Sequence, residues 1–100
     1  MKIKIGVRNY TVSFPDTIAP SSITRGRINY AESTIKVARK AGMPPRKLSE
    51  MRMYHAMWHE FVHGILADMG SRKERDEKFV DELAKRIVQI ERQLWQKSKQ

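Results

Sequence analysis

The chain has 100 residues and no cysteine, and its 20 basic and 11 acidic side chains give it a formal net charge of +9. This length predicts a single domain that is too small to include a separate substrate domain. The lack of cysteine excludes a thiolate zinc site, a cysteine nucleophile and a disulfide framework, and it leaves imidazole and carboxylate groups as the zinc ligands that this chain can supply.

The first 40 residues are expected to form mostly strands. Residues 2–14 alternate apolar and polar side chains on either side of a polar turn, which is typical of a β-hairpin. Two further short runs, 26–30 and 34–38, predict a second hairpin. We expect the four strands to form one antiparallel sheet with one apolar face. The second hairpin would end at a sheet edge, which either pairs with an extended peptide or is merely protected by its basic side chains.

The N-terminal residues alternate charged and aliphatic side chains and lack the apolar core of a signal peptide. No apolar run is long enough to cross a membrane. We therefore expect a soluble cytoplasmic protein. Its basic residues are spread over the whole length, which favours a solvated surface over a nucleic-acid footprint, where they should cluster.

Residues 45–69 are expected to form one long helix, because proline is tolerated in a first helical turn and apolar side chains recur at helical spacing. The helix contains the sequence His-Glu-Phe-Val-His. Its two histidines, His59 and His63, are four residues apart, so both imidazoles lie on one face and can bind one zinc ion. Glu60 between them is placed to act as a general base toward water. His55 is too far from His63 along the helix for both to bind the same ion.

Gly70 is expected to end this helix in a left-handed conformation, and a Ser-x-x-Glu capping pattern predicts a second helix over residues 72–97. A tight turn makes the two helices antiparallel neighbours. The predicted fold is therefore α+β: a sheet of two hairpins packed on a hairpin of two long helices, in one domain of residues 1–100.

A zinc peptidase site needs a third protein ligand. When the chain folds back at its glycine turn, Glu77 comes opposite His63 and Asp81 comes opposite His59. We predict Glu77 as the third metal ligand. Asp81 is predicted to accept a hydrogen bond from the outer nitrogen of a ligating histidine, with His59 preferred, and so to fix its tautomer. Asp81 as the ligand itself is the nearest alternative.

The run His59-Glu60-Phe61-Val62-His63, followed by Glu77-Lys78-Phe79-Val80-Asp81, resembles the gluzincin pattern HExxH…ExxxD. Together with the strand runs before it, nearly the whole chain is similar to small phage and prophage proteins of the ImmA/IrrE-like metallopeptidase group. The resemblance implies a zinc cofactor, a bacterial or phage intracellular origin, and a regulatory protein such as a repressor as the substrate.

The predicted activity is zinc-dependent peptide hydrolysis, with His59, His63 and Glu77 as metal ligands and Glu60 as general base. No oxyanion-stabilising side chain can be assigned from the sequence. Two alternatives stay open. One is a basic nucleic-acid-binding accessory protein in which the cluster is incidental, and the other is a non-catalytic, zinc-stabilised protein that binds a partner.

Overall fold

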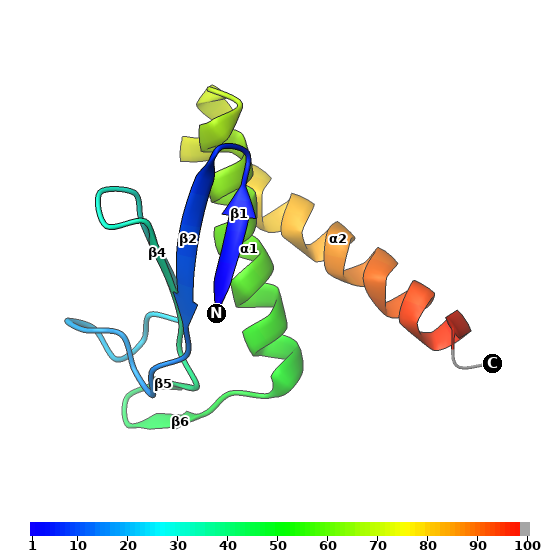
Figure 1. Ribbon diagram of the computed structural model, residues 1–100. Helices are drawn as coiled ribbons and strands as arrows, with labels where there is room; N and C mark the ends of the chain where they lie inside the picture. Colours follow the sequence, from blue (N-terminus) through cyan, green and yellow to red (C-terminus); the bar gives the residue numbers. More distant parts are fainter. Residues whose placement is uncertain (99–100) are drawn as a thin grey trace.

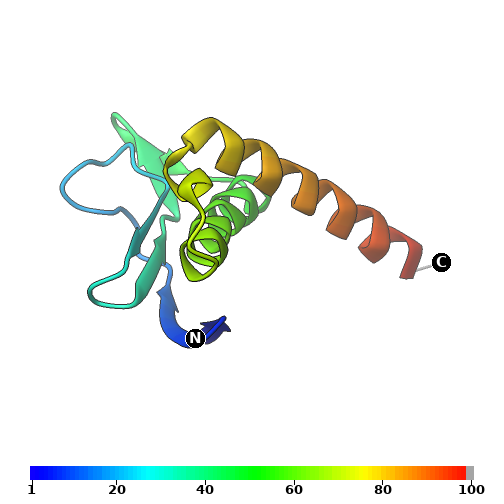
Figure 2. The same cartoon turned by 90° about the horizontal axis from the view of Figure 1, so that it is seen from above.

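The computed structural model describes residues 1–98, and its fold is α+β, with strands in the first half of the chain and helices in the second (Figure 1). Helix α1 lies between the main sheet and helix α2, so the three form successive layers (Figures 1 and 2). The elements in chain order are β1 (Lys2–Ile5), β2 (Arg8–Ser13), β3 (Gly26–Asn29), β4 (Thr34–Val37), β5 (Lys40–Gly42), β6 (Pro45–Lys47), α1 (Glu50–Asp68), the 3₁₀ helix η1 (Arg72–Arg75) and α2 (Glu77–Ser98).

The main sheet has the strand order β1-β2-β4-β3 and is mixed, so the prediction of a wholly antiparallel sheet was wrong. Both expected hairpins are present, β1 with β2 and β3 with β4, but β2 and β4 pair in parallel, with Val12 opposite Ile35. The cause is the long connection of residues 14–25. It leads the chain past the position next to β2, so β3 forms the outer edge of the sheet. Strand β4 then occupies the position between β2 and β3 and runs in the same direction as β2.

The alternating apolar side chains of the two central strands form the core against α1. Tyr10 and Val12 on β2, and Ile35 and Val37 on β4, are buried together with Phe61 of α1. Alternation therefore identified the inner face of the sheet, because successive side chains of a strand point to opposite faces.

Helix α1 begins at Glu50 and not at residue 45 as predicted. Residues 45–47 form β6, which pairs with β5 in a small separate hairpin. The later start is explained by Ser49, whose side chain accepts a hydrogen bond from the backbone N–H of Arg52 at 3.2 Å and so caps the helix. Proline suits both a first helical turn and a short strand at an edge, so it could not distinguish the two.

The predicted helix over residues 72–97 is divided into η1 and α2. Gly70 has a φ of +68° and ends α1 in the left-handed conformation, as predicted. Ser71 caps η1 rather than a continuous helix, and Asp76 caps the first turn of α2. The cap at Asp76 separates η1 from α2, so the residues of η1 do not continue the path of α2.

Helix α2 packs on α1 near the glycine turn and then diverges from it. Val62 and Leu66 of α1 contact Val80 and Ala84 of α2 in a second buried cluster. Beyond this cluster the two helices diverge, although the Tyr54 hydroxyl of α1 still donates a hydrogen bond to Glu91 of α2, and the C-terminal part of α2 projects from the body of the molecule (Figures 1 and 2). Among residues 1–98, neither helix combines the length and the apolar character needed to cross a lipid bilayer.

Candidate metal centre

The three predicted zinc ligands come together between α1 and α2, close to the glycine turn. Nε2 of His59 lies 3.0 Å from Oε2 of Glu77, and Nε2 of His63 lies 3.0 Å from Oε1 of the same carboxylate. The ligand atoms of the three residues all lie within 4.8 Å of one another. Two atoms that bind one zinc ion tetrahedrally at about 2.0–2.1 Å are roughly 3.3 Å apart, so this spacing suits a shared ion.

The helix packing explains why these side chains meet. His59 and His63 are one turn apart on α1, and their ring centroids are 5.0 Å apart. Val62 on α1 and Val80 on α2 are both buried in the contact between the helices. Because these neighbouring residues fix the rotation of each helix, Glu77 is directed toward the two imidazoles.

Asp81 lies in the outer position predicted for it. Its Oδ1 is 3.3 Å from Nδ1 of His59, whereas Nε2 of the same ring faces Glu77. Partial burial raises the pKa of Asp81, but hydrogen bonds with Lys85 and His59 outweigh it and hold the pKa below its ordinary value. The carboxylate therefore stays charged and can accept a hydrogen bond from the Nδ1–H group of His59.

His55 also lies beside Asp81, with its Nε2 3.3 Å from Oδ1 of that carboxylate. The two atoms are within ion-pair distance but are not aligned for a hydrogen bond. His55 is not one of the three residues whose ligand atoms lie within 4.8 Å of one another.

Glu74 is the residue of this centre that sequence reasoning missed. Its Oε1 lies 3.3 Å from Nδ1 of His63, although without hydrogen-bond alignment, and it accepts a hydrogen bond of 2.6 Å from the Tyr30 hydroxyl. Burial, followed by this hydrogen bond, raises the pKa of Tyr30 above its ordinary value, so the phenol stays a donor. His59 and His63, the two candidate metal ligands, thus each have a carboxylate beside Nδ1. The sequence did contain a signal for this position. Asp76 is a second cap residue five positions after Ser71, and it indicates that Glu74 belongs to a helical turn separate from α2.

Glu60 is buried beside the donors and against strand β3. It is only 7% exposed, and this burial raises the pKa of its carboxyl group, while the nearby His59 and His63 act in the opposite direction. A Cβ atom on Gly26 would lie 2.9 Å from Oε2 of Glu60, so a larger residue at the start of β3 would require the Glu60 carboxylate to shift. Glu60 also lines a cavity of about 240 Å³ that His59 borders. It is therefore a carboxylate held next to the donors without being one of them.

No family model matches this chain, and no curated protein or solved structure does either. Two imidazoles and a carboxylate, with further carboxylates beside the outer nitrogens, form a donor set that suits zinc. The likeness to gluzincins remains a prediction based on the two motifs.

Proposed function

We propose that this protein is a zinc-dependent metallopeptidase of the gluzincin kind, similar to the ImmA/IrrE-like group. The observation that carries the proposal is the single carboxylate of Glu77, which contacts His59 and His63 from the opposite helix while Glu60 stays outside the donor set. A purely structural site has no need of a fourth, buried carboxylate with a raised pKa beside its donors.

His59, His63 and Glu77 would hold the metal, and Asp81 and Glu74 would orient the two imidazoles through their outer nitrogens. When bound, zinc supplies Lewis-acid chemistry, which polarises the scissile carbonyl and makes water easier to deprotonate. Glu60 accepts the proton of the attacking water and transfers it to the departing amine. Its buried position keeps the carboxylate at a fixed place, with few alternative solvent contacts.

The substrate in this proposal is an extended peptide that pairs with strand β3. In the main sheet of the described residues, β3 is an outer strand that pairs only with β4, and its first residue, Gly26, lies against Glu60. A peptide added to this edge would pass the general base and the metal donors. By the same resemblance, the site of action would be the cytoplasm of a bacterial or phage-infected cell, and the substrate a regulatory protein such as a repressor.

The test is zinc content and peptide cleavage of the purified chain, with a peptide library derived from a bacterial proteome as the probe. Wild type should bind about one zinc ion and cleave a defined subset of peptides. Glu60→Gln should keep the zinc and lose about 10²–10⁴-fold in turnover, because it removes only the base. Glu82→Gln is the matched control, since Glu82 is exposed and paired with Arg86 at 2.8 Å.

Other outcomes would overturn the proposal. If His59→Ala changes neither the zinc content nor the cleavage, the metal centre is incidental. A protein that binds zinc tightly but cleaves no library peptide would instead be the non-catalytic, zinc-stabilised alternative, and zinc removal would then lower its stability without any loss of activity.

A further inference from the structure

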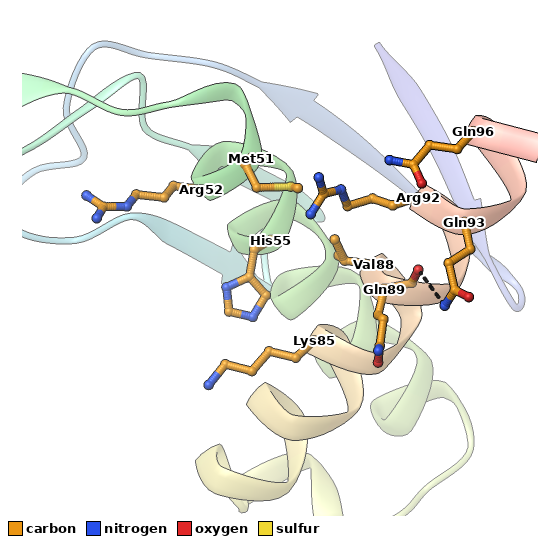
Figure 3. A pocket seen from close by; sticks show the side chains of 9 residues that line it. All are labelled: Met51, Arg52, His55, Lys85, Val88, Gln89, Arg92, Gln93 and Gln96. Atoms are coloured by element: carbon orange, nitrogen blue, oxygen red, sulfur yellow. Dashed lines mark hydrogen bonds between the residues drawn. The ribbon is translucent and has the colours of Figure 1, made fainter. Parts of the chain in front are cut away.

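A second hollow lies between the two helices, on the side away from the glycine turn. Its volume is about 580 Å³, and side chains from the first half of α1 and the later part of α2 surround it (Figure 3). It is distinct from the smaller cavity of the metal centre. Its lining consists of Met51, Arg52, His55, Lys85, Val88, Gln89, Arg92, Gln93 and Gln96.

The lining of this hollow, here called the basic hollow, contains three permanent cations and three amides but no carboxylate. Lys85 is paired with Asp81 at 3.1 Å. In the part of the chain that the structure describes, the guanidinium groups of Arg52 and Arg92 have no carboxylate partner. Figure 3 shows Arg92 reaching from α2 toward Met51 on α1, while Arg52 extends outward at the rim. Two unpaired guanidinium groups of this kind favour a carboxylate or phosphate as the ligand.

The basic hollow adjoins the cavity of the metal centre. Arg52 and His55 line both the basic hollow and the cavity of about 240 Å³ that contains Glu60. Arg52 precedes His59 by about two helical turns, or roughly 10 Å of helix rise. An extended peptide covers that distance in about three residues. One ligand can therefore occupy both places at once.

The charge distribution favours a short acidic peptide over a nucleic acid. The cavity of the metal centre places the carboxylates of Glu60 and Asp81 beside Arg25 and Arg52, so its lining is not a continuous basic track for a phosphate backbone. Among the described residues that line the two cavities, the cations without a carboxylate partner are Arg25, Arg52 and Arg92, which is fewer than the roughly 6–10 phosphate contacts of a typical DNA-binding surface. A single acidic side chain on a peptide needs only one cationic site.

We propose that the basic hollow is a specificity subsite that binds an Asp or Glu side chain of the substrate, two to three residues from the cleaved bond. The proposal rests on the peptidase function for its biological meaning. The recognition itself is the binding of a carboxylate by Arg92 in the hollow, with Arg52 adding positive charge at its rim, and it can be measured without any cleavage. No electron or group transfer is involved.

The cleavage experiment uses pairs of peptides from the library that differ by Glu against Gln at the second and third positions from the cleaved bond. We expect wild type to prefer the Glu peptides by about 10-fold in kcat/KM, as one charge-assisted contact would give. Arg92→Gln and Arg52→Gln should each reduce this ratio, and the double variant should bring it to about one. Arg86→Gln is the matched control on α2, because Arg86 is already paired with Glu82, and it should keep the ratio.

A binding measurement separates this proposal from the peptidase function. Zinc-loaded Glu60→Gln protein is titrated with a fluorescein-labelled Ala-based peptide that contains three consecutive glutamates, and with its Gln analogue. Tighter binding of the Glu peptide that is lost in Arg92→Gln supports the subsite, even where no peptide is cleaved. Equal binding of the two peptides overturns it. A competition with a single-stranded 20-nucleotide DNA provides a second test. The proposal is also overturned if this DNA binds through Arg92 and displaces the labelled Glu peptide more strongly than the unlabelled Glu peptide does, because the cations would then serve nucleic-acid binding.

Discussion

The two ends of the α1–α2 pair differ in packing and in chemistry. At the end with the Gly70 turn, the helices are joined by a short connection and pack through a buried cluster that includes Val62 and Val80. At the other end α1 begins after β6, α2 continues outward, and Leu94 is 63% exposed (Figure 1). A short connection holds two helices close, whereas free ends are held only by their side chains.

This difference explains where the two proposed sites, the metal centre and the acidic-residue subsite, lie along the helix pair. A metal site needs donors held within a few tenths of an ångström, which a tightly packed helix pair provides. A substrate subsite needs open space and unpaired charge, which diverging helices provide. The packed end is therefore where His63 and Glu77 meet, and the open end is where Arg52 and Arg92 face solvent.

Leu66→Ala tests the packing of the closed end and should have the largest effect. Leu66 is 7% exposed and belongs to the cluster between the helices. Removing a buried leucine side chain costs about 2–5 kcal/mol in the free energy of unfolding, because the cavity left behind closes only in part. Urea unfolding of the metal-free protein measures the change. A loss below about 1 kcal/mol would mean that this cluster does not hold the helices together.

Glu77→Ala tests the proposed metal ligand that links the helices. We expect the zinc affinity to fall by at least about 100-fold, more than the loss of an outer partner causes, because a metal ligand itself is removed. Competition with a chromophoric chelator measures it. Asp81→Ala is the matched variant, and its loss should stay within about 10–100-fold. If Asp81→Ala is the more damaging of the two, Asp81 is the third ligand and the two roles are exchanged.

Glu74→Gln tests the partner of the second histidine and should have a smaller effect. The amide keeps the shape but loses the charge beside Nδ1 of His63, so we expect about a 10-fold lower zinc affinity. Tyr30→Phe, which removes only the hydroxyl that donates to Glu74, should lower the affinity less than Glu74→Gln does. Unchanged zinc binding in Glu74→Gln would leave Glu74 as a structural partner of Tyr30 alone.

Local patterns were enough to predict the inner face of the sheet, the glycine turn and the pairing of Glu77 with the two histidines. Each of these features depends on the spacing of side chains along one element or on the antiparallel packing of two helices joined by a tight turn. The parallel pairing of β2 with β4 could not be predicted in this way, because strand order depends on where the long connection of residues 14–25 leads. Glu74 was missed for a different reason. The cap at Asp76 begins a new helix. A prediction that folds one continuous helix back at Gly70 therefore misplaces the residues before Asp76, and Glu74 is one of them.

Leu94→Ala is expected to have the smallest effect and tests the open end. An exposed leucine loses little apolar contact when it is shortened, so the free energy of unfolding should change by less than about 0.5 kcal/mol. Zinc affinity should also stay within error of wild type, because the metal donors are held by the cluster at the other end of the helices. Urea unfolding and chelator competition, run beside Leu66→Ala, compare the same substitution at the two ends. A Leu94→Ala protein as unstable as Leu66→Ala would show that the outer part of α2 is also held by burial, and the contrast between a packed end and an open end would then be lost.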